Sequence, residues 1–285
     1  MYVDAILDKD GDKILVVKRE NGQRVYDEHK AEYVFYYDSP NGKHTTIYGT
    51  PVTKFSSNNN KEFRKELNIQ NNKRIWEGDI NPVFRCLADN YRGIGSPKLH
   101  IGFLDIETNW DSERGFSSPE DPFTAITAIS VYLSWTDQLI TFALPPKNLS
   151  WDRATEIASK FENVFLFENE REMLVEFLNL IEDVDLLSGW NSEGFDIPYI
   201  VNRIAKILSK DDTRRLCLWN QFPKKRTFER FGSEHVTFDL VGRIHMDYMQ
   251  LYRKYTYEER HSYALNAIGE YELGETKVQY EGHTF

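Results

Sequence analysis

The sequence is poor in cysteine and has no long apolar run. Its 285 residues include two cysteines, Cys86 and Cys217, and no C-x-x-C pair, so neither a disulfide framework nor a cysteine metal site is expected. Both thiols are predicted to be buried in a protein of a reducing compartment. The N-terminus lacks a basic segment followed by an apolar one, and no apolar run reaches the roughly 18 residues of a membrane span. The sequence therefore predicts neither a signal peptide nor a membrane-bound protein.

The chain also lacks an excess of positive charge. Its net charge is -10, which by itself opposes a nucleic-acid partner. Positive charge is nevertheless concentrated locally. Residues 210–230 hold seven basic and three acidic residues, and residues 53–74 hold six basic and two acidic ones. Each stretch either binds phosphates or forms part of a solvated surface of mixed charge, and the composition is compatible with both alternatives.

What is present is enough apolar material for packed cores, at 40% hydrophobic and 14% aromatic residues. Residues 1 to about 50 predict short strands, with turns at Gly11, Gly22 and Asn41–Gly42. Two short helices are expected at "NKEFRKELNI" and "NPVFRCLADNY", the second beginning at Asn81–Pro82. The Gly- and Pro-containing segment "RGIGSPK" marks a domain boundary. We therefore expect a smaller, mostly β N-terminal domain over residues 1–98 and a second domain over residues 99–285.

The second domain mixes strands and helices. Three apolar strands, "LHIGFLDIE", "TAITAISVYLSW" and "QLITFALP", predict an antiparallel meander. A helix with Ser150 as its N-cap follows. Another is expected over "ENEREMLVEFLNLIEDV", where Asn169 and Glu172 fit the positions of a capping box. A short buried strand, "VDLLSGWN", then leads to the helix "DIPYIVNRIAKILSK", whose apolar stripe is Ile197, Ile200, Val201, Ile204 and Leu208. The fold class is α/β, a mixed sheet with flanking helices.

Two acids interrupt the first of these strands. In "HIGFLDIETNW", Asp105 and Glu107 are two positions apart, so their side chains point to the same face and Ile106 points to the other. Their mutual repulsion favours a cation between them, and Mg²⁺ or Mn²⁺ prefers carboxylate oxygens. The alternative is a strand end at which both acids are solvated.

A third acid, Asp196, stands where the strand "LLSGWN" passes into a helix. Asp is a good N-cap, and Pro198 suits a first helical turn, so a capping role is one interpretation. The other makes Asp196 a further ligand of the cation at Asp105 and Glu107.

Together, "FLDIET" and "GWNSEGFDIPYIVNR" resemble the first and second exonuclease motifs of family B DNA polymerases, particularly those of T-even-like bacteriophages. "IYGTPVTK" and "WEGDINPVFRCLADNY" look like the N-terminal domain of the cyanophage branch, and "HMDYMQLYRKYTYEERHSYALNAIGEYELG" resembles the later part of the exonuclease domain. The resemblance implies a ribonuclease-H-like 3′–5′ proofreading exonuclease domain in a phage protein of the host cytoplasm. It further implies two Mg²⁺ or Mn²⁺ ions held by Asp105, Glu107 and Asp196.

The same resemblance suggests residues that contact DNA. Phe116 matches an aromatic residue that packs against a frayed primer end, although a loop Phe covering the core is equally compatible with the sequence. Asn191 matches a residue near the substrate phosphates. Lys224, Lys225 and Arg226 begin a predicted hairpin with its turn at Gly232–Ser233, which in the family helps to part primer from template.

One part of the family pattern is missing from residues 1–285. The third exonuclease motif is a Tyr followed four residues later by Asp, whereas Tyr280 is followed by Thr284. The polymerase half is also missing. We therefore expect an expressed fragment, the first chain of a split polymerase completed by a second chain, or a non-catalytic DNA- or RNA-binding module. RNA binding through the N-terminal domain would follow from the resemblance to the T-even group.

Overall fold

The computed structural model describes residues 2–93, 95–230 and 232–278, without the side chains of Arg230 and Ser233. The chain divides into two compact units, one of Met1–Leu99 with Val241–Ile244 and one of His100–Leu240 with His245–Phe285. The division after Leu99 lies one residue beyond the boundary expected from the sequence. The sequence did not predict that residues 241–244 belong to the first unit. A segment of four residues is too short for a hydrophobic pattern that would assign it to one domain or the other.

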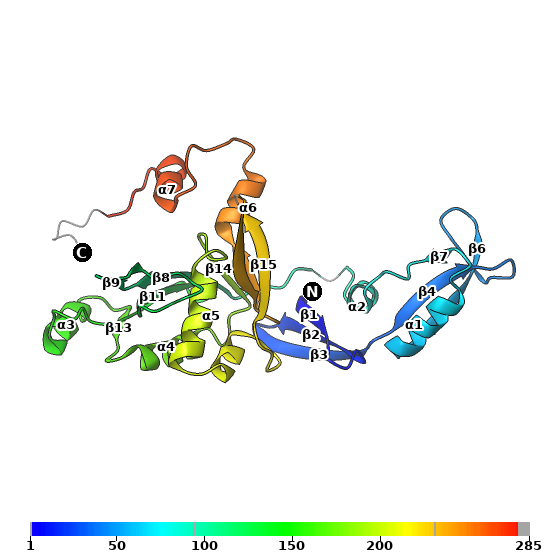
Figure 1. Ribbon diagram of the computed structural model, residues 1–285, viewed down its shortest axis with the longest axis horizontal. Helices are drawn as coiled ribbons and strands as arrows, with labels where there is room; N and C mark the ends of the chain where they lie inside the picture. The colour runs from blue at the N-terminus through cyan, green and yellow to red at the C-terminus, as the bar shows by residue number, and fades with distance from the viewer. Residues whose placement is uncertain (1, 94, 231, 279–285) are drawn as a thin grey trace. The chain divides into compact units, whose positions relative to one another are not determined.

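The first unit contains two antiparallel sheets and two helices (Figure 1). Its strands are ordered β1-β2-β3 in one sheet and β5-β6-β4-β7 in the other. The elements are β1 (Tyr2–Leu7), β2 (Lys13–Glu20), β3 (Gln23–Lys30), β4 (Tyr33–Asp38), β5 (His44–Thr45), β6 (Pro51–Ser57), α1 (Asn60–Ile69), β7 (Ile75–Trp76) and α2 (Pro82–Asn90). Gly11 and Gly22 have positive φ in the turns after β1 and β2, as predicted. The predicted turn at Asn41–Gly42 is also present, with Gly42 N donating to the Ser39 carbonyl at 2.9 Å, but β5 after it pairs with β6 and not with β4.

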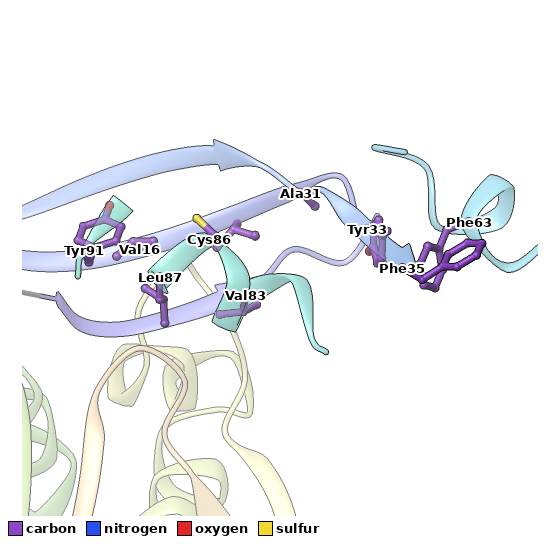
Figure 2. Packing of buried hydrophobic residues seen from close by; sticks show 10 residues of the cluster. Val16, Ala31, Tyr33, Phe35, Phe63, Val83, Cys86, Leu87 and Tyr91 are labelled. Carbon is purple, nitrogen blue, oxygen red and sulfur yellow. The ribbon is translucent and has the colours of Figure 1, made fainter. Parts of the chain in front are cut away.

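The core of the first unit joins both sheets to both helices (Figure 2). Phe35 from β4 and Phe63 from α1 meet with their ring centroids 5.6 Å apart. Val83, Cys86 and Leu87 of α2 belong to the same buried cluster. Cys86 and Cys217 are both buried, as the sequence predicted.

The second unit is built on a six-stranded mixed sheet of order β13-β12-β11-β8-β14-β17. Its strands are β8 (Ile101–Thr108), β11 (Ile126–Leu133), β12 (Gln138–Ala143), β13 (Val164–Leu166), β14 (Leu186–Gly189) and β17 (Ile244–Asp247), the last beginning in the first unit. Two separate ribbons are β9 (Trp110–Asp111) with β10 (Gly115–Phe116), and β15 (Lys224–Arg230) with β16 (Ser233–Asp239). The predicted meander is confirmed, since β8, β11 and β12 pair antiparallel. The parallel partner of β8 on its other side is β14.

The helices of the second unit include the two for which capping residues were predicted. The helices of this unit are α3 (Trp151–Ala158), α4 (Glu170–Leu180), α5 (Asp196–Ile207), α6 (Tyr248–Tyr255) and α7 (Leu265–Leu273), with a 3₁₀ helix at Asp211–Leu216. Ser150 accepts from Arg153 N and Asn169 accepts from Glu172 N, so both caps are confirmed. No helix within the described ranges has the length and apolar character needed to cross a membrane. This mixed sheet with flanking helices is the fold class that the sequence predicted.

Candidate active site

The two acids of β8 share one face of the central strand. Leu104 and Ile106 are buried on the other face, at 3% and 6% exposure, whereas Asp105 and Glu107 are exposed. In the pairing with β11, Asp105 lies opposite Ser130 and Glu107 opposite Ala128. The residues of β11 that face the two acids are therefore uncharged.

Asp196 reaches β8 from the start of α5. Pairing of β14 with β8 ends at Ser188 and Phe103, which leaves the edge of β8 open beyond that point. The N–H of Ile106 donates to Asp196 Oδ1 at 3.1 Å across this open edge. The capping interpretation of Asp196 is wrong, because the N-cap position is Phe195 and no side chain caps the helix. Asp196 is instead a buried carboxylate attached to the strand that carries the acid pair.

Negative charge accumulates around Asp196. Burial, the nearby Asp105 carboxylate and Asp247 together raise the pKa of Asp196 to about 7, against hydrogen bonds from backbone N–H groups that lower it. Part of the Asp105 side chain is exposed, but loss of water around its carboxyl still raises its pKa, an effect that the positive charge of Lys277 opposes. A cation bound between Asp105 and Asp196 would relieve both effects.

A fourth acid, Asp247, shapes the loop between β14 and α5. Asp247 is buried at the end of β17, where its carboxylate accepts from the backbone N–H groups of Asn191 and Glu193, each at 3.1 Å. It also caps α6 by accepting from Met249 N at 2.9 Å. Sequence reasoning missed this residue, although an Asp directly before a helical pattern is a capping signal that could have found it.

Gly189 allows this loop to pass close to β8. A Cβ at Gly189 would lie 2.6 Å from the carbonyl oxygen of Leu104 and 2.9 Å from the Cβ of Ser192. Contacts this short exclude a side chain, because one of them is with backbone. The glycine in "SGWN" thus brings the end of β14 against the strand that carries the acids.

The structure brings Asp105 and Asp196 together without assembling a full metal cage. Within residues 2–93, 95–230 and 232–278, no three His, Cys, Asp or Glu side chains form a group that could hold a metal ion. Glu107 is exposed two positions along the same face of β8. The chemistry of the donors still fits hard divalent ions. Carboxylate oxygens are the ligands that such ions prefer, and the raised pKa values of Asp105 and Asp196 show that nearby positive charge would stabilise their ionised forms.

Phe116 and Asn191 lie outside the central sheet, on a short ribbon and a loop. Phe116, on β10, is 78% exposed, so its interpretation as a cover for the core is wrong. It pairs across the ribbon with Trp110, which is also exposed. Asn191 takes φ of 61°, a left-handed conformation that Asn tolerates well. An exposed aromatic ring in a strand ribbon is available to stack on a base.

Part of the positive charge at residues 210–230 is neutralised within the fold, at Arg214 and Arg226. Arg226 forms ion pairs with Glu193 and Asp239, and Arg214 pairs with Asp211 while stacking on Phe222. The side chains of Lys224 and Lys225 at the start of β15 are exposed. The hairpin itself is confirmed, but Arg230 pairs with Ser233, so its connection lies one residue earlier than the predicted Gly232–Ser233 turn. The two lysines are therefore the better candidates for phosphate contacts.

The structure describes the chain up to residue 278, before the two residues that differ from the third exonuclease motif. Tyr280 and Thr284 lie outside the part of the chain that the structure describes. The last described residues include Lys277, whose charge acts on Asp105.

A mixed sheet with paired carboxylates on its central strand β8, joined by a third from helix α5, is typical of the ribonuclease-H-like class of folds. Residues 50–268 match the model of the DNA polymerase family B exonuclease domain. The chain therefore belongs to the family B DNA polymerases, through their exonuclease domain.

Polymerases of phages and of an archaeon are among the relatives of this chain. The chain is 29% identical to the DNA-directed DNA polymerase of Escherichia phage RB69 over 264 residues, which is 84% of this chain and 29% of that protein. It is 34% identical to the DNA-directed DNA polymerase of Enterobacteria phage T4 over 205 residues, or 65% of this chain and 22% of that protein. A DNA polymerase of Thermococcus aggregans is 27% identical over 71% of this chain and 10% of its own length. The chain thus spans less than a third of the length of these relatives.

Proposed function

We propose that this chain is the proofreading part of a phage replicative DNA polymerase, hydrolysing the 3′ end of a primer in the cytoplasm of the host bacterium. Its substrate would be single-stranded or frayed DNA, because a reacting 3′ end must leave the duplex. The polymerase half would be supplied by a second chain or by a longer form of this one. The family match and the phage relatives support this assignment.

The hydrogen bond between Ile106 N–H and Asp196 carries the proposal, because it joins the two acidic elements of the sequence in space. Asp105, Glu107 and Asp196 are the residues that would hold two Mg²⁺ or Mn²⁺ ions. Such ions, when bound, supply a water of lowered pKa and stabilise the leaving 3′ oxygen. Phe116 would stack on the terminal base, and Asn191 would lie beside a phosphate. Lys224 and Lys225 would bind the DNA backbone, with Arg226 holding the hairpin to Glu193.

Manganese binding tests this assignment directly. We expect Asp105→Ala and Asp196→Asn each to weaken Mn²⁺ binding at least about tenfold, because each removes a charged oxygen ligand. Isothermal titration of the full chain at pH 7.5 measures the effect. Asp152→Asn, at an exposed acid in the first turn of α3, is the matched control and should leave binding unchanged. Equal Mn²⁺ affinity in the Asp196→Asn variant would remove Asp196 from the site.

A second candidate function is nucleic-acid binding by the first unit without catalysis. Aromatic and basic side chains alternate around its four-stranded sheet. Lys73 lies over the Tyr37 ring, with Nζ 4.4 Å from the centroid, and the Arg74 guanidinium lies 4.1 Å from the centroid of Trp76. Tyr48, which is 73% exposed, has its ring centroid 5.9 Å from that of Trp76. Rings and cations in this arrangement suit a single-stranded nucleic acid, and the resemblance to the T-even group favours RNA.

Salt titrations with two charge-reversal pairs separate these surfaces. We expect Lys224→Glu with Lys225→Glu to weaken binding of single-stranded DNA and to reduce its log–log salt slope by about 0.7 for each phosphate that the lysines neutralise in the wild type. Lys73→Glu with Arg74→Glu should leave DNA binding nearly unchanged and reduce the slope for RNA. Fluorescence anisotropy with labelled 12-mers of each type gives both slopes. A wild-type salt slope for DNA binding in the Lys224→Glu, Lys225→Glu variant would rule out the two lysines as phosphate contacts.

A further inference from the structure

A polar stripe runs along one side of α5, beginning at Asp196. Tyr199, Asn202, Arg203 and Lys206 follow at spacings of three or four residues and all donate hydrogen bonds to the segment 117–124. The apolar residues predicted from the sequence, such as Ile200 and Ile204, are buried on the remainder of the helix. The helix thus connects β8, at its first residue, with the loop that follows β10.

The strongest part of this connection is a buried group of three hydroxyls. Ser117, Thr124 and Tyr199 are 5%, 7% and 0% exposed. The Tyr199 hydroxyl lies 2.6 Å from Ser117 Oγ and 2.9 Å from Thr124 Oγ1, and it donates to the Thr124 carbonyl at 2.8 Å. Ser117 and Thr124 also hydrogen bond to each other. Because these residues stand at the two ends of the segment 117–124, Tyr199 closes the base of the loop.

Further bonds fix the middle of the loop. Asn202 Nδ2 donates to the Pro119 carbonyl and Arg203 Nη1 to the Pro122 carbonyl, both at 2.8 Å. Arg203 is itself held by Glu170, whose Oε1 accepts from Arg203 Nε at 2.6 Å and from Ile126 N at 2.9 Å. A segment with no regular secondary structure therefore has its carbonyls anchored to a helix at several points. Removing one buried hydroxyl would loosen it without breaking the fold.

Phe116 directly precedes this anchored segment. Its ring is 78% exposed, while the next residue, Ser117, is buried in the hydroxyl group. The position of the ring relative to Asp196 thus depends on Ser117 and on four residues of α5, which are Tyr199, Asn202, Arg203 and Lys206. We propose that Tyr199 is a positioning residue that, through Ser117 and Thr124, holds Phe116 at a fixed distance from the carboxylates so that it can stack on the terminal base. This inference rests on the role assigned to Phe116 in the proposed function.

The test uses the full chain and a single-stranded 10-mer with 2-aminopurine at its 3′ end, without divalent metal so that no hydrolysis occurs. Stacking on Phe116 should quench the 2-aminopurine fluorescence at saturation, and Phe116→Ala should abolish the quench and weaken binding about tenfold. We expect Tyr199→Phe to lose at least about half of the quench. Combining it with Phe116→Ala should add no further loss, because both variants act on one interaction.

Controls separate positioning from folding. Tyr33→Phe removes a buried hydroxyl that donates to the Gly11 carbonyl in the first unit, and it should keep the full quench. Asn202→Ala breaks only the bond to Pro119 and should give a smaller loss than Tyr199→Phe. Mn²⁺ affinity should stay at the wild-type value in the Tyr199→Phe variant, since Asp196 is untouched.

Two results would overturn these assignments in different ways. A full wild-type quench in Tyr199→Phe would refute the positioning role while leaving Phe116 in the proposed function. No quench in the wild type, or an unchanged quench in Phe116→Ala, would refute the stacking role of Phe116 and the positioning role with it.

Discussion

Replacing Asp196 by Asn is expected to stabilise the metal-free chain at pH 8, by up to about 4 kcal/mol. The folded-state pKa of Asp196 is about 7, against an ordinary value of 3.8. Folding therefore retains a proton that the unfolded chain releases, so the stability contributed by Asp196 is fully present below about pH 4 and is lost as the pH rises to about 7. Above that pH the ionised carboxylate stays beside Asp105 and Asp247 at a constant cost. The side-chain amide of the Asp196→Asn variant would keep an acceptor for Ile106 N–H without the charge.

Urea unfolding followed by tryptophan fluorescence between pH 4 and pH 8 measures this difference. Five of the six tryptophans lie in the second unit, so the signal reports mainly on the unit that contains Asp196. The two proteins should be nearly equal at pH 4 and diverge towards pH 8. Mn²⁺ should raise the stability of the wild type and change the variant little. A variant less stable than the wild type at pH 8 would show that the backbone donors more than compensate the buried charge.

The parts of this molecule that follow from local pattern could be predicted. Alternation along β8 put Asp105 and Glu107 on one face, and Ser150 and Asn169 began their helices as capping residues do. From the residues alone, Asp196 had two interpretations: a helix cap, or a further ligand of the cation at Asp105 and Glu107. Only the three-dimensional course of β14 and α5 decides between them, because a cap and a strand contact require the same residue type at the same position.

Features that depend on long-range partners could not be predicted. The ion pairs of Arg226 with Glu193 and Asp239 join residues 33 and 13 positions apart, so the sequence overstates how available the basic residues of 210–230 are. The burial of Tyr199 and Arg203 in the polar stripe of α5 could not be predicted either, because their partners are also far away in the sequence. Tyr199 and Arg203 look like solvent-facing residues of an amphipathic helix, but hydroxyl and carbonyl partners from the loop 117–124 allow them to be buried.

The second large effect is expected in the rate of hydrolysis. Residues 1–285 lack the Tyr and Asp of the third exonuclease motif, and the described residues form no three-ligand metal group. We therefore expect this 285-residue polypeptide to cleave a 3′-labelled single-stranded oligonucleotide very slowly in Mg²⁺. Adding a polypeptide that carries the third motif and the polymerase half should raise the single-turnover rate by about 10²–10⁴-fold. The effects of the missing Tyr and the missing Asp need not add, because both act on one chemical step.

The acid pair provides the control for that experiment. Asp105→Ala in this chain should abolish the gain from the second polypeptide, because the added residues would complete a site that has lost its first ligand. Asp152→Asn should retain the gain. Full wild-type hydrolysis by residues 1–285 alone, abolished in Asp105→Ala, would mean that Asp105, Glu107 and Asp196 suffice to hold the ions. The orienting residues of the third motif would then be dispensable here, since the hydrogen bond from Ile106 N–H already holds Asp196 to the strand that carries Asp105 and Glu107.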